Sequence, residues 1–148
     1  MSDLIPWREM VAEVTAMAEL SLPPDLVLAM VMKESSGDPW AIRWEPDFYT
    51  KYVVPIPDLT PTERMARACS WGLMQVMGQV AREHGFQGRY LTQLCEPAVG
   101  LLWGCKHLAR FLKKYGNESD AIAAYNAGSP RKKADGVAYV NQEYVDGV

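Results

Sequence analysis

One stretch of this chain, residues 97–116, has the pattern of a long amphipathic helix. Pro97 suits a first helical turn, because its ring fixes a helical φ and its missing N–H has no partner there. Gly116 suits the end, because it readily adopts the left-handed conformation that terminates many helices. A helix with one apolar face needs other apolar surfaces to cover it, so the sequence predicts a helical core around this element. The residues at core spacing are Leu101, Leu102, Cys105, Leu108, Ala109 and Leu112.

Shorter stretches on both sides have the same spacing and are separated by proline, glycine and polar residues. Pro6 precedes the first of them, and Pro23 and Pro24 break the chain before the second. Thr60 and Pro61 give a cap and a first-turn proline for the third. The sequence therefore predicts an all-α, mainly helical single domain over residues 1–148. Its further helices are expected over residues 7–18, 24–34, 61–69, 70–85, 119–128 and 138–145.

Residues 40–61 form the least regular part of the chain. Loops of this length without regular structure are uncommon in a domain unless they bind something. We therefore expect an ordered excursion, with a small β element in the 40–60 region and with one or two aromatic rings that stack on a ligand. The aromatic residues of this segment are Trp40, Trp44, Phe48, Tyr49 and Tyr52.

The overall composition excludes several classes of protein. With 148 residues, 49% hydrophobic and 22% charged, the chain is typical of one soluble globular domain. A formal net charge of -3 argues against a dedicated nucleic-acid-binding protein, which needs a basic surface to neutralise phosphates. No stretch approaches the roughly 20 apolar residues needed to cross a bilayer. Residues 1–7 lack a secretory pattern, so we expect synthesis in the cytoplasm without a signal peptide.

The three cysteines, Cys69, Cys95 and Cys105, have neither a metal-binding spacing nor the even number typical of a disulfide framework. We interpret them as reduced thiols, mostly in the core, and a disulfide between Cys95 and Cys105 is the less favoured alternative. The sequence offers no pattern for a metal or another cofactor, and we expect none.

A carboxylate continues the apolar stripe of the second predicted helix. Leu26, Met30 and Glu34 follow one another at intervals of four, so Glu34 lies on or beside the inward face at the helix end. Burial disfavours the charged form of a carboxyl group, which raises its pKa and keeps it protonated near neutral pH. Such a group can donate a proton to a leaving oxygen. Because an isolated helical glutamate is more often solvated, this interpretation depends on other motifs.

Three short segments, in this order, resemble the lytic transglycosylases of the soluble and goose-type lysozyme-like group. They are Glu34-Ser35 at a helix end, residues 72–75 (Gly-Leu-Met-Gln) predicted to open a helix, and residues 124–128 (Ala-Tyr-Asn-Ala-Gly) closing another. The resemblance covers about residues 22–128 and implies a lysozyme-like fold with a glycan groove between helices. The segment between Pro39 and Ser70 is longer than in that family, so no substrate contacts are carried over to it.

The resemblance implies an enzyme that cleaves peptidoglycan strands without a cofactor. The bond cleaved is the β-1,4 linkage between N-acetylmuramic acid and N-acetylglucosamine, with Glu34 as general acid and then general base. The N-acetyl group of the substrate supports the developing cation, as in other substrate-assisted glycosidases. Glu34 then takes the proton of the C6 hydroxyl, and the sugar closes to a 1,6-anhydro end.

The same motifs provide a predicted substrate-binding set. Ser35 is expected to hydrogen-bond the catalytic carboxyl, although it also suits a helix end. Gln75 can exchange hydrogen bonds with an N-acetyl group or a sugar hydroxyl. By resemblance, Tyr125 faces the catalytic carboxyl and Asn126 holds the sugar or the opposite wall. Met74 joins this set as part of the second motif, but core packing is its simplest role.

Glu45 is the alternative second carboxylate and a further candidate for substrate binding. If it faced Glu34 across about 6.5–9.5 Å, a water molecule would fit between them and the enzyme would be a goose-type inverting muramidase, a hydrolase. A surface salt bridge between Glu45 and Arg43 explains the residue equally well. A third interpretation is a non-catalytic wall-binding or virion structural domain.

The partner implied by the resemblance is the glycan strand of peptidoglycan. We expect a monomer that acts on the cell wall or in the periplasm, without nucleic acid and without membrane insertion. A signal-less enzyme of this kind resembles phage lysins and tail-associated enzymes, which reach the wall through a holin-dependent route or inside a phage particle.

Overall fold

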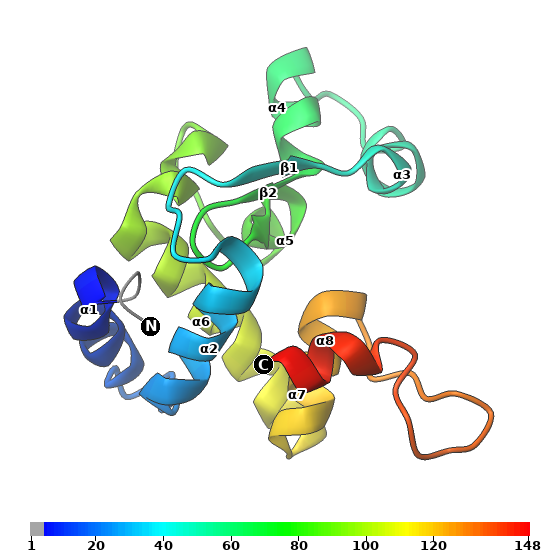
Figure 1. The fold of residues 1–148 in the computed structure, drawn as a ribbon. Coiled ribbons are helices and arrows are strands. Elements are labelled where there is room, and N and C mark those ends of the chain that lie inside the picture. The colour runs from blue at the N-terminus through cyan, green and yellow to red at the C-terminus, as the bar shows by residue number, and fades with distance from the viewer. Residues whose placement is uncertain (1–4) are drawn as a thin grey trace.

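Helix α6, Pro97–Tyr115, runs through the middle of the molecule, as Figure 1 shows. It contacts α1 (Ile5–Thr15) and α7 (Glu118–Ala127), and α1 in turn packs on α2 (Pro24–Ser35). Both of its predicted ends are confirmed, because Pro97 occupies the first turn and Gly116 caps the helix at a φ of +78°. This computed structural model describes residues 5–148. Part of the N-terminal segment that lacks a secretory pattern, residues 1–4, lies outside the described residues.

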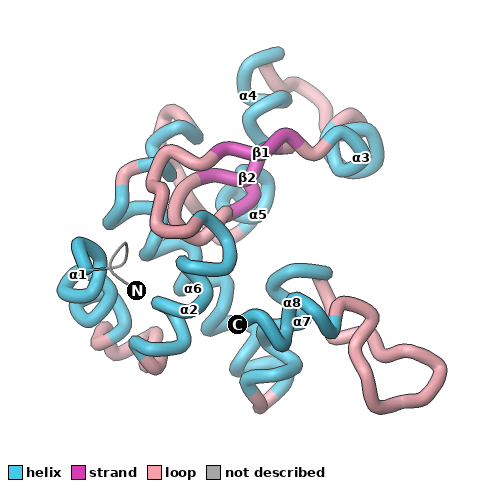
Figure 2. The backbone as a smooth tube through the Cα atoms, viewed as in Figure 1, coloured by secondary structure: helices cyan, strands magenta, loops and turns pink. Residues whose placement is uncertain are grey.

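The remaining elements are short, and Figure 2 shows how strongly helices dominate over strands. The mainly helical class predicted from the sequence is therefore confirmed. Within the described part of the chain, no helix combines the length and the apolar character needed to cross a bilayer. The short elements are α3 (Pro46–Phe48), η2 (Tyr49–Val53), α4 (Pro61–Arg67), α5 (Gly78–Glu83), η3 (Leu91–Cys95) and α8 (Gln142–Gly147).

The strands form one small antiparallel sheet in the order β1-β2-β3. Strand β1 (Ile42–Trp44) pairs with β2 (Cys69–Trp71), which pairs with β3 (Val76–Met77). β1 is the small β element expected in the 40–60 region. The rest of that segment continues into α3 and η2, where Trp44 packs against Tyr49 and Phe48 against Tyr52. The aromatic excursion is therefore ordered, as predicted.

The single helix predicted over residues 70–85 is wrong. Residues 69–77 form a hairpin, and only α5 is helical. Gly72 has a φ of +74° and Gln75 a φ of +50°, so the chain reverses at residues 72–75 instead of opening a helix. Apolar residues at helical spacing also suit a short hairpin buried on both faces. Pairing with β1, far away in the sequence, selects the hairpin.

Other predicted helices are confirmed with small shifts at their ends. The side chain of Thr60 accepts a hydrogen bond from the backbone N–H of Glu63 and caps α4. Asn117 caps α7 by accepting from the backbone N–H of Asp120. The C-terminal helix begins at Gln142 instead of near residue 138, because residues 138–141 belong to the preceding loop.

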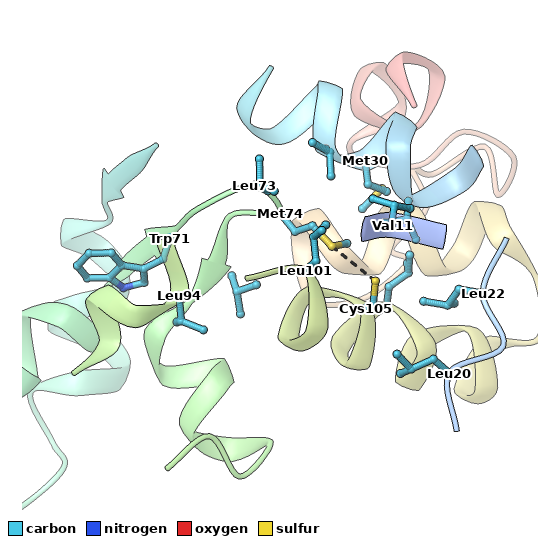
Figure 3. Close-up of a cluster of buried hydrophobic side chains, with 14 of the residues drawn as sticks. Val11, Leu20, Leu22, Met30, Trp71, Leu73, Met74, Leu94, Leu101 and Cys105 are labelled. Atoms are coloured by element: carbon cyan, nitrogen blue, oxygen red, sulfur yellow. Dashed lines mark hydrogen bonds between the residues drawn. The ribbon is translucent and has the colours of Figure 1, made fainter. Parts of the chain in front are cut away.

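The core lies between α1, α2, α6 and the hairpin, and Figure 3 shows its side chains. Met74, from the turn of the hairpin, is fully buried, and its Sδ lies 3.9 Å from Sγ of Cys105 on α6. Cys95 and Cys105 are buried and all three cysteines are free thiols, which confirms the interpretation as unpaired cysteines. The core fixes the hairpin turn against α2 and α6. The other side chains labelled in the figure are Val11, Leu20, Leu22, Met30, Trp71, Leu73, Leu94 and Leu101.

Candidate active site

A groove with a volume of about 720 Å³ lies beside the last turn of α2, the sheet, α6 and α7. It brings together residues that are far apart in the sequence. Of the predicted site residues, Glu34, Glu45, Gln75, Tyr125 and Asn126 line the groove, whereas Ser35 and Met74 do not. Further groove residues are Arg43, Phe48, Tyr52, Ser70, Val76, Met77, Val80, His107, Phe111, Ala124, Ala127 and Gly128.

Glu34 lies in the last turn of α2, partly buried, as the stripe of the helix predicts. Burial raises the pKa of its carboxyl group, and a hydrogen bond from Tyr144 and the charges of Arg43 and Lys33 oppose this effect without cancelling it. The end of α2 is also held by Trp7, whose indole Nε1 donates to the Gly37 carbonyl at 2.9 Å. The groove therefore contains a firmly placed carboxyl group that keeps its proton at a higher pH than usual.

Tyr144, on α8, is a site residue that the sequence analysis missed. Its hydroxyl group donates a hydrogen bond to Oε1 of Glu34. Burial raises the pKa of this hydroxyl, and the neighbouring charge of Glu34 raises it further, so it remains a donor. The ammonium group of Lys33 lies 5.9 Å from the centre of the Tyr144 ring. No motif marked Tyr144, because its contact with Glu34 depends on where a short terminal helix packs.

The packing of α8 is set by residues that join it to α7. Nδ2 of Asn141 donates to the carbonyl of Ala123 at 3.0 Å, and the Tyr139 hydroxyl donates to the Asp120 carboxylate. Tyr139 is buried although the loop before it is largely exposed. These contacts place α8 where the Tyr144 hydroxyl can reach Glu34.

Tyr125 lies in the groove beside Glu34, but it does not hydrogen-bond the carboxyl group. Its hydroxyl donates to the backbone carbonyl of Met74 at 2.6 Å. Burial raises the pKa of Tyr125 well above its usual value, and the nearby charge of Glu34 adds to this effect. Tyr125 therefore ties α7 to the hairpin turn and presents its ring to the groove.

Gln75 projects from the same hairpin turn with a fixed amide. Its Nε2 donates to the carbonyl of Ala41 at 2.9 Å and to that of Gly72 at 3.1 Å. Both N–H donors are thus engaged with the backbone. Among the described residues Oε1 has no hydrogen-bond partner, so Gln75 offers an acceptor to the groove.

Asn126 also lines the groove, and it offers a donor where Gln75 offers an acceptor. Its Oδ1 accepts a hydrogen bond from Nδ2 of Asn141 at 2.9 Å, and the backbone carbonyl of Ala123 fixes the orientation of Asn141 by accepting from the same nitrogen. The amide nitrogen of Asn126 is then free to donate. Asn126 is exposed at the groove, so this donor is available to a ligand.

Ser35 does not contact the Glu34 carboxyl as predicted, whereas Met74 has the core-packing role given above as its simplest one. Oγ of Ser35 lies 2.8 Å from the Leu73 carbonyl oxygen and 3.1 Å from that of Val31, and it accepts from the backbone N–H of Gly37. It therefore ties α2 to the hairpin turn instead of contacting the Glu34 carboxyl. The side chain of Met74 is fully buried, and only its carbonyl, through Tyr125, serves the site.

Glu45 lines the groove in an ion pair. Its Oε1 lies 3.0 Å from Nε of Arg43, which also lines the groove. This is the salt bridge that the sequence analysis gave as the alternative role of Glu45. The groove therefore holds one paired carboxylate, Glu45, and one whose hydrogen-bond partner is neutral, Glu34.

Comparison with known protein families gives a match over most of the chain. The model of a family described as "Transglycosylase SLT domain" matches residues 13–144, a wider range than the residues 22–128 suggested by the three motifs. No curated protein matches the chain. No solved structure matches it either.

Proposed function

The chain belongs to the transglycosylase SLT domain family, whose activity is lytic cleavage of peptidoglycan by a mainly helical, lysozyme-like domain, and we propose that Glu34 is its general acid and base. The bond cleaved is the β-1,4 linkage between N-acetylmuramic acid and N-acetylglucosamine. The product is a 1,6-anhydro-muramic end. The observation that carries this proposal is the burial of the Glu34 carboxyl, which raises its pKa, in a groove of about 720 Å³ that is large enough for sugar residues.

The first step of the proposed reaction is proton transfer from Glu34 to the leaving oxygen. The bond between C1 of the muramic acid and that oxygen breaks as the proton arrives. The N-acetyl group of the same sugar supports the positive charge that develops at C1. Glu34 becomes a carboxylate, and the hydroxyl of Tyr144 supports that charge by donating a hydrogen bond.

In the second step Glu34 acts as the base. It takes the proton of the C6 hydroxyl, whose oxygen forms the new bond to C1, and Glu34 returns to its protonated state. No water is consumed, and no second carboxylate is needed. The salt bridge between Glu45 and Arg43 supports this single-carboxylate proposal, because a carboxylate oxygen engaged by a guanidinium group is less available to activate water.

The polar residues of the groove support sugar binding with a defined polarity. Gln75 offers an acceptor to hydroxyl or amide N–H groups, and Asn126 offers a donor to carbonyl or hydroxyl oxygens. The rings of Phe48 and Tyr52 line the same groove and provide apolar surface for sugar faces.

The proposal is tested by measuring soluble fragments released from purified peptidoglycan. Glu34→Gln should lower the initial rate by about 10²- to 10⁴-fold, because the amide keeps the shape but cannot give its proton. Glu9→Gln, on the exposed face of α1, is the matched control and should keep the wild-type rate. Unchanged release by Glu34→Gln would contradict the assignment.

The inverting hydrolase is the second candidate, because Glu45 does line the groove with Glu34. In that mechanism Glu45 would activate water, so Glu45→Gln would abolish release as completely as Glu34→Gln. In the transglycosylase mechanism Glu45→Gln removes only the ion pair with Arg43, and the smaller loss of rate separates the two mechanisms.

A further inference from the structure

A second polar cluster adjoins the groove through His107, whose ring lies 5.2 Å from that of Tyr125 between centroids. It consists of His107 and Arg110 on α6 and of His84, which follows α5. Nε2 of His84 lies 2.8 Å from Nδ1 of His107, and Nη1 of Arg110 lies 3.5 Å from Nδ1 of His84. The proposed mechanism does not use any of these three residues.

The order of these contacts determines which nitrogen carries each proton. A guanidinium group only donates, so the contact with Arg110 favours the tautomer in which Nδ1 of His84 is the acceptor. Neutral His84 then carries its hydrogen on Nε2 and donates it to Nδ1 of His107. Because Nδ1 of His107 accepts, the hydrogen of neutral His107 is on Nε2.

That Nε2–H group of His107 is available to a ligand. His107 lines the groove, and its Nε2 makes no hydrogen bond to any residue in the described range. It is not among the buried polar atoms that lack a partner, so solvent reaches it. The His107 ring is held between Phe111, at a centroid distance of 4.6 Å, and Tyr125, at 5.2 Å. The donor is therefore fixed in position before any ligand arrives.

The surroundings of His84 and His107 favour the neutral form of both rings. Burial lowers the pKa of His107 to about 3, and His84 and Arg110 act in the same direction. Burial also lowers the pKa of His84, with Arg110 and Lys106 contributing and Glu83 opposing. Protonation of His84 would leave its Nε2–H donating to His107, so the donor in the groove persists even then.

The surroundings of His107 indicate the kind of acceptor that fits. Phe111 is in ring contact with His107, and Met77 and Val80 are further apolar residues that line the same groove. A neutral donor beside apolar side chains matches an acetamido group, whose carbonyl accepts a hydrogen bond while its methyl group packs against carbon. A sugar hydroxyl has no such apolar part.

We propose that His107 is a substrate-binding residue whose Nε2–H donates to the acetamido carbonyl of a sugar bound beside Tyr125, and that His84 and Arg110 are positioning residues that hold His107 in this tautomer. This inference rests on the proposed function, because it assumes that the groove holds an N-acetylated glycan.

The tautomer is tested directly by ¹⁵N NMR of the imidazole groups in the unmodified protein. His107 should show a protonated Nε2 and an unprotonated Nδ1, without titration between pH 5 and 8, a range set by the usual histidine pKa of about 6.5. Observation of hydrogen on Nδ1, or of a charged ring at neutral pH, would overturn the proposal. This readout requires neither activity nor ligand.

Ligand binding is tested by calorimetric titration with a β-1,4-linked N-acetylglucosamine hexamer, in a Glu34→Gln background that prevents turnover. His107→Phe keeps a ring but removes the donor, and it should weaken binding about tenfold, the range expected for one hydrogen bond. His107→Gln retains an N–H at the end of the side chain and should restore most of the affinity. Melting temperatures equal to that of the Glu34→Gln parent establish that the fold of both variants is intact.

The outcomes separate this inference from the proposed function. If wild-type protein cleaves peptidoglycan but His107→Phe binds the hexamer as tightly as the parent, only the role of His107 is overturned. If both variants lose affinity equally, the donor is not what matters and the proposal is overturned as well. If Glu34→Gln does not bind the hexamer and wild-type protein releases no fragments, the proposed function itself fails.

Discussion

Gly72 opens the hairpin turn that carries Met74 and Gln75, and replacing it with alanine should destabilise the protein through two separable effects. Its φ is +74°, where an L-residue costs about 1 kcal/mol or more. A Cβ atom at this position would also lie 2.5 Å from the backbone oxygen of Leu94, so one of the two segments must move. Forced repacking of this kind costs about 1–3 kcal/mol, which gives a total of about 3 kcal/mol.

The matched control is Gly116→Ala at the end of α6. Its φ is +78°, nearly the same, but no atom lies within 4 Å of the added Cβ. Gly116→Ala should therefore cost about 1 kcal/mol, and Gly72→Ala about 3 kcal/mol. At about 3 °C per kcal/mol for a chain of this size, the expected decreases in Tm are about 3 °C and about 9 °C.

Calorimetric melting of both variants tests this expectation, and fragment release well below the transitions tests its functional consequence. Gly72→Ala should lose activity even where it is fully folded, because the displaced turn holds the acceptor of Tyr125 and the amide of Gln75. Gly116→Ala should keep wild-type activity. Equal decreases in Tm for the two variants would refute the claim that the contact with Leu94 constrains the turn.

Three further predictions concern the residues around the groove. Tyr144→Phe removes a hydrogen bond that lowers the pKa of Glu34, so the alkaline limb of the rate profile should move to higher pH; a shift to lower pH would contradict this role. Glu34→Gln should be more stable than wild type at pH 7, by on the order of 1 kcal/mol, when unfolding in denaturant is compared. Because the pKa of Glu34 is raised in the folded state, the stability of the wild type should fall as pH rises from about 4.3, the unfolded value, through the folded pKa. Below about pH 4.3 the wild type and Glu34→Gln should be equally stable. Asn141→Asp loses its donor to Asn126 and to the Ala123 carbonyl, so the Asn126 amide should turn its carbonyl toward the groove and α8 should dock less firmly on α7; KM should rise about tenfold and kcat should fall as well, and unchanged values of both would show that these contacts are unimportant.

The elements that the sequence predicted most accurately are those whose ends require a particular backbone conformation. Pro97 and Gly116 mark α6 because few other residues suit those two positions, and the stripe through Leu26 and Met30 placed Glu34 at the groove. These signals are local, and no distant contact is needed to read them. The motif at residues 72–75, through its family resemblance, led to Gln75, which does line the groove although the turn around it was predicted as helix.

The failures came from interactions between distant segments. Pairing of Ile42 with Trp71 turns a helical pattern into a hairpin, and periodicity alone does not distinguish the two. Tyr144 reaches Glu34 only because Tyr139 and Asn141 dock α8 on α7. The positioning roles of Ser35 and Asn141 likewise depend on backbone carbonyls from other elements.

The central claim, that one carboxyl group closes a 1,6-anhydro ring without water, is tested most directly by mass spectrometry of muropeptides released in isotopically heavy water. We expect anhydro-muropeptides that contain no heavy oxygen, and their loss in Glu34→Gln. Reducing ends that carry heavy oxygen would contradict the mechanism and would assign water activation to a second group, with Glu45 the first residue to examine.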